Sequence, residues 1–385
     1  MRTAQPFSFH FLNKDDKMIY FDNSATTPIF PEVIEKMTEG MKIFGNPSSR
    51  HTLGLEASKE LAHARESVAR LMSADSGEIY FTSGGTESDN IAIFGGANIK
   101  KGRRVVTTAI EHPAVLRCFE ELERRGFEAV YVKPQRDGSV RAEDILSCIN
   151  KDTSLVSVMH VNNETGAVMP VESLGRAIKE IAPRALFHTD AVQSFGHIPF
   201  KPSLWGIDIA SVSAHKLHGP KGTGALYVRK GVSLKTSIFG GGQEKGLRSG
   251  TENTVSVMGF GRACELIDCE IGMKKAVSIN EYLKKELLST DGAVLNGGGE
   301  NESPYILNIS FGKIRSEIML NALSNEKIYV SSGSACSSGS RKSHVLSEMG
   351  AYGDSAIRFS FSCQNTLREA EITAETIKRI EKELR

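Results

Sequence analysis

The sequence predicts an α/β fold in which a mainly parallel sheet is covered by helices and is followed by a smaller α+β domain. Through the middle of the chain, short runs of β-branched and aliphatic residues alternate with helical patterns, which is typical of parallel strands joined by crossover helices. After about Cys269 this alternation stops, and a long helix, a glycine-rich turn at 297–299, a strand and a terminal helix follow. A length of 385 residues suits two compact domains.

Each expected strand is short and apolar, as in a sheet with both faces buried. Helical periodicity places Leu61, Ala64, Val68, Leu71 and Met72 on one face of a helix. A second helix is expected at 115–125, and a later one runs through Lys284. We expect strands at 18–21, 78–81, 104–108, 128–133, 154–160, 185–189, 208–213, 224–229 and 306–311.

The charge balance favours neither nucleic acid nor a membrane surface as a partner. Lys plus Arg number 47 and Asp plus Glu 46, which gives a net charge of +1. No apolar run approaches the ~20 residues that span a bilayer. Residues 1–17 lack a signal-peptide pattern and are interpreted as an extension or a tag. The six cysteines form no C-x-x-C pair, so we expect free thiols in a reducing cytoplasm.

One candidate phosphate site is the run Ser83-Gly84-Gly85-Thr86, between an expected strand and an expected helix. Glycines let the backbone approach an anion, and the N–H groups and dipole of a helix N-terminus favour negative charge. An ordinary strand–turn–helix connection with Thr86 as the N-cap would show the same residues. The run has neither the Walker A nor the G-x-G-x-x-G pattern, so a nucleotide is not the favoured ligand.

Asp190 and Lys216 each follow a predicted strand, about one strand–connection–strand step apart. Ligands of such sheets bind beyond the carboxyl ends of the strands, so both side chains could face one crevice. The carboxylate could pair with a protonated ring nitrogen, and a desolvated lysine amine can react with an aldehyde. Viewed alone, Asp190 reads as a helix cap and Lys216 as a solvated lysine. His215 and His218 have a metal-ligand spacing, but no third ligand is apparent, so no metal is expected.

Cys336 lies in the middle of a small, polar run from Ser331 to Ser340. Structural cysteines usually have apolar neighbours, so this thiol is expected to reach solvent and to act as a nucleophile. An ordinary Gly/Ser loop with an incidental cysteine is the alternative. A pyridoxal phosphate site needs a glycine-rich turn that binds phosphate, a carboxylate that pairs with a ring nitrogen, and a lysine that reacts with an aldehyde. The three candidates described above supply these parts.

At these residues the sequence resembles the NifS/IscS-type cysteine desulfurases, in the class V aminotransferase-like group of fold-type I enzymes. The resemblance runs from Ile19 to nearly the C-terminus. It implies a mainly parallel seven-stranded sheet, with 18–32 packing on the small domain, 33–270 as the large cofactor-binding domain, and 271–385 as the small domain that carries the cysteine. The motifs that carry it are Tyr20 to Pro28, Gly45 to Ser49, Thr82 to Ser88, Glu111-His112, His160 to Glu164, Ser213 to Lys216, Arg248 to Thr251, Ser331 to Cys336 and Ile357 to Ser360.

The resemblance also implies a role for individual residues. Lys216 would bind pyridoxal phosphate covalently and move protons, and His112 would stack on its ring and assist acid–base steps. Asp190 would pair with the ring nitrogen, and Gln193 with the phenolic oxygen. Cys336 would attack the sulfur of L-cysteine, forming a persulfide and leaving L-alanine. The phosphate would be held by Gly85, Thr86, Ser213 and His215, with Thr251 donated by the second subunit of a homodimer, and the substrate carboxylate by Asn163, Arg358 and nearby Asn46.

Two departures bear on the sulfur acceptor. The run after Cys336 looks slightly shorter than in relatives that serve the iron–sulfur scaffold, with Arg341 and Lys342 where those carry an acidic residue and proline. The chain also ends at Arg385, without the tail that helps to dock the scaffold. We therefore expect delivery to a thiolation enzyme, as in tRNA thiolation, rather than general iron–sulfur assembly. The rival interpretations are a selenocysteine lyase, another class V aminotransferase, or a non-catalytic sulfur-relay adapter.

Overall fold

The computed structural model describes residues 18–98, 102–312, 314–332, 343–351 and 353–384. Its central element is a seven-stranded sheet with the strand order β2-β8-β7-β6-β5-β3-β4. The parallel neighbours β3 and β4, and likewise β5 and β6, are joined through a helix, as the alternating pattern predicts. The strands are β2 (Ile79–Thr82), β3 (Arg104–Thr108), β4 (Glu128–Val132), β5 (Thr153–Ser157), β6 (Leu186–Asp190), β7 (Ile209–Ser213) and β8 (Gly224–Val228).

The direction of the strands confirms a mainly parallel sheet. Strands β4, β3, β5, β6 and β7 pair in parallel, whereas β8 runs antiparallel to both β7 and β2. Because β3, β5, β6 and β7 run the same way, their carboxyl ends open at one edge of the sheet. That edge is where an α/β sheet binds its ligands.

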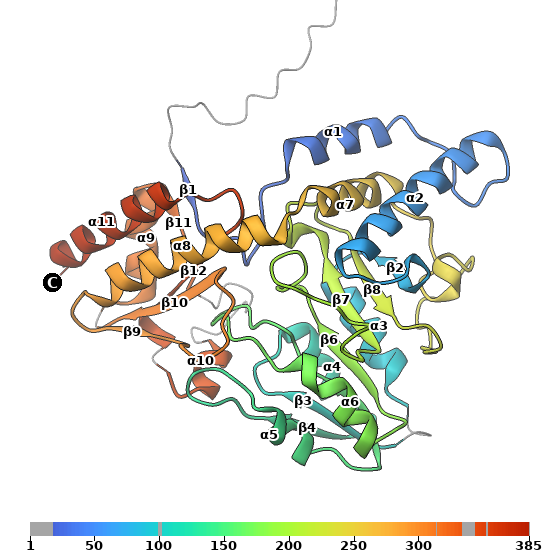
Figure 1. Ribbon diagram of the computed structural model, residues 1–385, viewed down its shortest axis with the longest axis horizontal. Coiled ribbons are helices and arrows are strands. Elements are labelled where there is room, and N and C mark those ends of the chain that lie inside the picture. Colours follow the sequence, from blue (N-terminus) through green and yellow to red (C-terminus); the bar gives the residue numbers. More distant parts are fainter. Residues whose placement is uncertain (1–17, 99–101, 313, 333–342, 352, 385) are drawn as a thin grey trace, which may run out of the picture.

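Both faces of this sheet are buried under helices, because successive strand residues point to opposite sides. Leu155 and Leu186 join a core with α3 (Gly85–Gly96) and α4 (Pro113–Arg124). Their neighbours Val156 and Phe187 join the core on the other face. That second face is covered by helices α2 (Thr52–Leu71), α5 (Ala142–Ser147), α6 (Val171–Ile181) and α7 (Thr254–Leu266), and α1 (Pro31–Gly40) packs against α7 (Figure 1).

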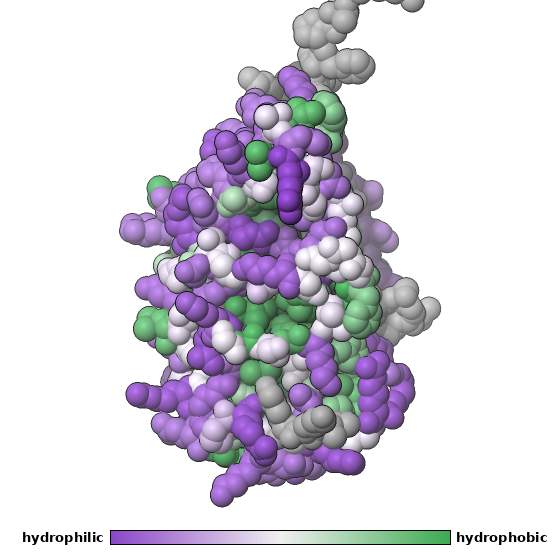
Figure 2. Space-filling view, turned by 90° about the vertical axis from the view of Figure 1, so that its right-hand side faces the viewer, coloured by the Kyte–Doolittle hydropathy of each residue, from purple (hydrophilic) through white to green (hydrophobic). Residues whose placement is uncertain are grey.

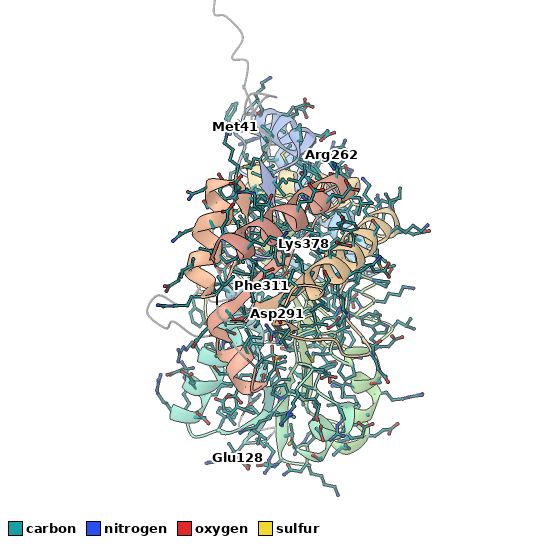
Figure 3. The ribbon with its side chains drawn as sticks, turned by 90° about the vertical axis from the view of Figure 1, so that its left-hand side faces the viewer. Met41, Glu128, Arg262, Asp291, Phe311 and Lys378 are labelled. Atoms are coloured by element: carbon teal, nitrogen blue, oxygen red, sulfur yellow. The ribbon has the colours of Figure 1, made fainter. Side chains whose placement is uncertain are left out.

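A separate hydrophobic core lies in the C-terminal part of the chain. Its antiparallel sheet has the order β12-β10-β9, formed by Ala356–Ser360, Ile306–Phe311 and Ala293–Leu295. Lys378 of α11 (Leu367–Leu384), labelled in Figure 3, pairs at 2.5 Å with Glu286 of the neighbouring α8 (Cys269–Leu288). The remaining elements here are α9 (Ser316–Asn325) and β1 (Ile19–Tyr20), which pairs in parallel with β11 (Ile328–Tyr329). Helix α10 (His344–Glu348) instead buries Val345 and Leu346 in the core of the large sheet.

The N-terminal segment contacts both cores. Ile19 and Phe21 are buried in the C-terminal core, whereas Phe30 is buried in the core of the large sheet and stacks on His218. The domain limits at 33–270 and 271–385 stay predictions. Polar side chains cover most of the face in Figure 2, and a hydrophobic patch lies near its middle. Within the described residues, no helix is both long and apolar enough to cross a bilayer.

One expected strand is too long. The expected strand at 154–160 corresponds to β5, which ends at Ser157. Beyond it, Val158 and His160 still donate backbone hydrogen bonds to β6. The chain then turns sharply at Asn162, whose side-chain oxygen accepts from the N–H groups of Glu164 and Thr165. The apolar sequence continues through this turn because the turn itself is buried.

Candidate active site

A cavity of about 520 Å³ opens at the carboxyl ends of β6 and β7. It is bounded by the N-termini of α3 and α4, by the segment after β1, and by β12 from the C-terminal part of the chain. Ten of the residues that the sequence predicts for the site line it. They are Gly85, Thr86, His112, Asn163, Asp190, Gln193, Ser213, His215, Lys216 and Arg358.

Asp190, the last residue of β6, supplies a buried carboxylate to this cavity. One of its oxygens, Oδ1, accepts a hydrogen bond from the backbone N–H of Val192 at 2.9 Å. Burial raises the pKa of Asp190 to about 6, while that hydrogen bond and the charge of Lys216 oppose the rise. A cation or a protonated ring nitrogen in the cavity would restore its ionised form.

Lys216 reaches the cavity from the short 3-10 helix Ala214–Lys216, which directly follows β7. Its Nζ atom donates to the carbonyl oxygen of Ala25 at 2.8 Å and also to that of Ser24. Gln193 donates to the same Ser24 carbonyl at 2.9 Å. The segment after β1 therefore holds the amine at the cavity wall, where an aldehyde could reach it.

The N-terminus of α3 forms a second hollow of about 480 Å³, which shares Gly85, Thr86, Ser213 and His215 with the first. The first N–H groups of a helix have no partner within the helix, so they are available to an anion. A Cβ atom on Gly85 would lie 2.8 Å from Cγ2 of Val192, which is too close for any side chain. A side chain at position 85 would therefore have to displace Val192 at the cavity wall.

His112 is the N-cap of α4, and its ring lines the cavity. Burial is the largest cause that lowers its pKa, to about 4, with smaller contributions from Lys216 and His344. The ring is therefore neutral at physiological pH. A neutral ring can lie against an aromatic cofactor and still exchange a proton through its nitrogens.

Arg358 brings a buried guanidinium from β12, and its residue is only 4% exposed. Its Nη1 atom donates to the carbonyl oxygen of Asn163 at 2.9 Å, and Nη2 pairs with Asp22 at 2.8 Å. The Nε atom is buried and has no hydrogen-bond partner among the described residues. An unpaired donor on a buried cation is a binding point for a carboxylate.

Several cavity residues carry no role predicted from the sequence, among them Glu164, Ser343 and His344. Glu164 follows Asn163, and Ser343 and His344 come just after the segment that carries Cys336. Ser343 donates from Oγ to Oε2 of Glu164 at 2.5 Å, and Nε2 of His344 lies 3.1 Å from the carbonyl oxygen of Glu111. Only the closeness of Glu164 to Asn163 in sequence could have signalled this arrangement.

Two other predicted site residues lie away from the cavity in the single chain. Asn46 and Thr251 are exposed, and the side chain of Asn46 accepts from the N–H of Ser48. Cys336 lies outside the described residues. The five cysteines that the structure describes are free thiols. No group of three or more His, Cys, Asp or Glu side chains within the described ranges could hold a metal ion.

The residues of the cavity fit pyridoxal phosphate. A glycine-lined helix N-terminus suits its phosphate, the buried Asp190 carboxylate suits its ring nitrogen, and the Lys216 amine suits its aldehyde. When bound, this cofactor supplies an electron-withdrawing ring to which the substrate's α-carbon is conjugated. The Nε atom of Arg358, unpaired within the part of the chain that the structure describes, suits the carboxylate of a substrate.

Comparisons with known proteins agree with this geometry. The class-V aminotransferase family model matches residues 19–372. Cysteine desulfurase IscS of Dictyoglomus turgidum is 42% identical over 379 residues, covering 95% of both chains. A solved NifS-like protein is 38% identical with a TM-score of 0.89, covering 95% of this chain and 100% of the other. SspA, solved in complex with cysteine, is 34% identical with a TM-score of 0.79, covering 89% and 98%.

The resemblance and the fold that the sequence predicted are thereby confirmed, together with the cofactor that the family uses. The chain belongs to the class-V aminotransferase family, within its pyridoxal phosphate-dependent cysteine desulfurases of the IscS/NifS type.

Proposed function

We propose that the protein converts L-cysteine to L-alanine and holds the released sulfur as a persulfide on Cys336. In the net reaction the C–S bond of the substrate is replaced by a C–H bond, and a new S–S bond forms on the Cys336 thiol. The two electrons that the carbon gains come from the transferred sulfur, so no external oxidant or reductant is needed. The observation that carries the proposal is the meeting of Lys216, Asp190 and Arg358 at one cavity.

The cavity residues named above divide the steps of this reaction between them. Arg358 and Asn163 hold the substrate carboxylate, and Lys216 takes the α-proton and returns a proton to the product. Asp190 pairs with the ring nitrogen of the cofactor, and His112 lies against its ring. The relative SspA was solved with cysteine bound, which supports cysteine as the ligand of a cavity of this kind. Gln193 is proposed for the phenolic oxygen, and Gly85, Thr86, Ser213 and His215 for the phosphate.

The test is a visible spectrum of the purified holoenzyme before and after addition of L-cysteine, followed by mass analysis of the Cys336 peptide. We expect a cofactor band that changes with cysteine, one molecule of alanine per sulfur released, and a gain of one sulfur atom on the peptide. Cys336→Ser should lose the gain, whereas Cys148→Ser, at a partly buried thiol outside the cavity, should keep it. Sulfur found on a different cysteine would overturn the assignment.

The same variant separates the rival functions. A selenocysteine lyase or an aminotransferase on this fold does not need the thiol, so Cys336→Ala would leave those activities intact while abolishing sulfide release from cysteine. A non-catalytic adapter would show no cofactor band at all. The presence of a lysine amine and a buried carboxylate in one cavity favours the enzyme over the adapter.

We also propose that the protein acts as a homodimer. Large apolar side chains are exposed on one stretch of the chain between α1 and α2, with Met41 and Phe44 69% and 80% exposed. Thr251 is exposed in the single chain, and in the dimer it would reach the phosphate site of the partner subunit. The substrate role of Asn46, in the same exposed stretch, stays a prediction. Light scattering should give twice the mass of 41.9 kDa, and Thr251→Ala should weaken cofactor retention.

The sulfur acceptor is proposed to be a thiolation enzyme in the cytoplasm rather than an iron–sulfur scaffold. Arg341 and Lys342 follow the reactive cysteine where scaffold-serving relatives carry an acidic residue and proline. The test is transfer of labelled sulfur from the loaded enzyme to a purified tRNA-thiolating enzyme and to a scaffold protein. Transfer to the scaffold alone would reject the proposed acceptor. The proposed desulfurase reaction would still stand.

A further inference from the structure

We propose that Glu164 takes up a proton when the carboxylate of the substrate binds at Arg358. The inference rests on the proposed function, because it concerns the same cavity and the same substrate. Glu164 is buried and lines the cavity next to Asn163, whose carbonyl oxygen accepts from Arg358. Its backbone is fixed, since its N–H donates to Asn162 and its carbonyl oxygen accepts from Asn308.

Once the substrate binds, three anionic groups would share one cation. Arg358 already pairs with Asp22 at 2.8 Å and interacts electrostatically with Glu164. A bound substrate carboxylate would be a third anion beside this single guanidinium, where Arg358 and Glu164 are both buried. Like charges in a buried site disfavour each other's ionised form, and Glu164 can relieve the excess by accepting a proton.

Glu164 is the member of this group that is poised to change. Burial raises the pKa of Glu164 to about 7, against the opposing effects of the Ser343 hydrogen bond and of Arg358. Asp22 is less buried, with 22% of its side chain exposed, and it keeps a direct ion pair. A further negative charge at Arg358 therefore protonates Glu164 first.

The other titratable groups around Glu164 do not supply a competing cation. His344 of α10 and His112 of α4 both have lowered pKa values and are neutral near pH 7. Lys216, after β7, faces the Asp190 carboxylate and the carbonyl oxygens of the segment after β1. Arg117 and Glu120 on the rim of the cavity pair with each other at 2.7 Å.

A pH dependence of known sign follows. Above about pH 7 the free enzyme has an ionised Glu164, and substrate binding must recruit a proton. Binding of a carboxylate ligand should therefore weaken up to tenfold per pH unit above that value. Below it Glu164 already holds its proton, and this dependence disappears.

The experiment measures proton uptake by the holoenzyme on binding 3-mercaptopropionate. This ligand has the carboxylate and thiol of cysteine but no amine, so it cannot undergo the desulfurase reaction. Calorimetric titrations in two buffers with different heats of ionisation give the number of protons taken up. At pH 8 we expect close to one proton per ligand in the wild type and none in Glu164→Gln. Glu120→Gln, which removes a carboxyl at the cavity rim, should behave as the wild type.

A second variant keeps the test independent of how well Glu164→Gln folds. Ser343→Ala removes the hydrogen bond that favours the ionised Glu164, so the window of proton uptake should move to higher pH. Equal proton uptake in the wild type and Glu164→Gln, or none in the wild type at pH 8, would overturn the inference. An enzyme that produces alanine and persulfide normally but shows no uptake leaves the proposed function standing and removes this inference alone.

Discussion

Nδ1 of His112 accepts a hydrogen bond from the backbone N–H of Ala114 at 3.1 Å, closing the first turn of α4. Only an unprotonated nitrogen can accept, so the ring proton must be on Nε2. The lowered pKa of about 4 agrees, because protonation at Nδ1 would break the cap as well as place a charge in a buried site. The helix cap therefore fixes the tautomer in which Nε2 carries the ring proton.

Replacing His112 separates its capping role from its catalytic role. Asn is a good N-cap and Ala is a poor one, so His112→Ala should lose about 1 kcal/mol of stability and His112→Asn much less. Both lack the imidazole, so both should lose desulfurase activity by about 10²- to 10⁴-fold. Urea unfolding and kcat measured on the same preparations give the two numbers. Activity that tracks stability across the pair would show that His112 is only a cap.

Glu111 carries a second buried carboxyl just outside the cavity. Its Oε1 atom accepts from Thr108 and from the N–H of Met159, while Oε2 has no partner among the described residues. Burial raises its pKa to about 8. A carboxyl whose pKa is higher in the folded than in the unfolded state stabilises the fold fully below the unfolded value of 4.5, and this contribution is lost as the pH rises towards 8.

Glu111→Gln should therefore flatten the fall of stability with pH. The stability of the wild type relative to the variant should drop by on the order of 3 kcal/mol between pH 5 and pH 8. Urea unfolding at several pH values measures the difference. Glu172→Gln, at an exposed position of α6, is the matched control and should leave the wild-type slope. Parallel curves for the wild type and Glu111→Gln would mean that Glu111 is ionised in the fold.

Gly85→Ala tests whether the N-terminus of α3 needs a residue without a side chain to bind the cofactor. The new Cβ atom would meet Cγ2 of Val192 at 2.8 Å and push apart the helix N-terminus and the segment after Asp190. We expect the Kd for pyridoxal phosphate to rise at least tenfold, about 1.4 kcal/mol, by absorbance titration of the apoenzyme. Val192→Ala in the same chain should restore part of the affinity. Gly353→Ala, where the nearest atom would be 3.7 Å away, is the control and should bind as the wild type.

The strands and the sheet edge could be predicted from local pattern, because apolar runs and turn residues are properties of neighbouring positions. Asp190 and Lys216 were found for this reason, since Asp190 ends β6 and Lys216 lies just after the end of its parallel neighbour β7. The reverse direction of β8 carries no such signal, and a five-residue buried strand reads the same in either direction.

The contacts that complete the site join segments far apart in sequence. Ser343 and Glu164 are 179 positions apart, and Arg358 and Asp22 are 336 apart. No sequence pattern near Glu164 predicts that Ser343, the N-cap of α10, is its partner. The burial and the raised pKa of Glu164 result from the packing of this segment against the turn after β5. The pairing of Arg358 with Asp22 is likewise set by β12 lying beside the N-terminal segment, where Asp22 bridges to Ser360.

Asp22 reduces the positive potential that Arg358 presents to a substrate carboxylate. Asp22→Asn keeps an oxygen that can accept from Nη2 but removes the charge, so the KM for L-cysteine should fall by about three- to tenfold, a change of roughly 1 kcal/mol at an effective dielectric constant near 20. Asp22→Ala removes the acceptor as well, frees the guanidinium to move, and should raise the KM. Steady-state alanine formation at fixed pH measures both variants. A KM that rises equally in the two would show that Asp22 only positions Arg358, because a loss of charge competition lowers the KM whenever the geometry is kept.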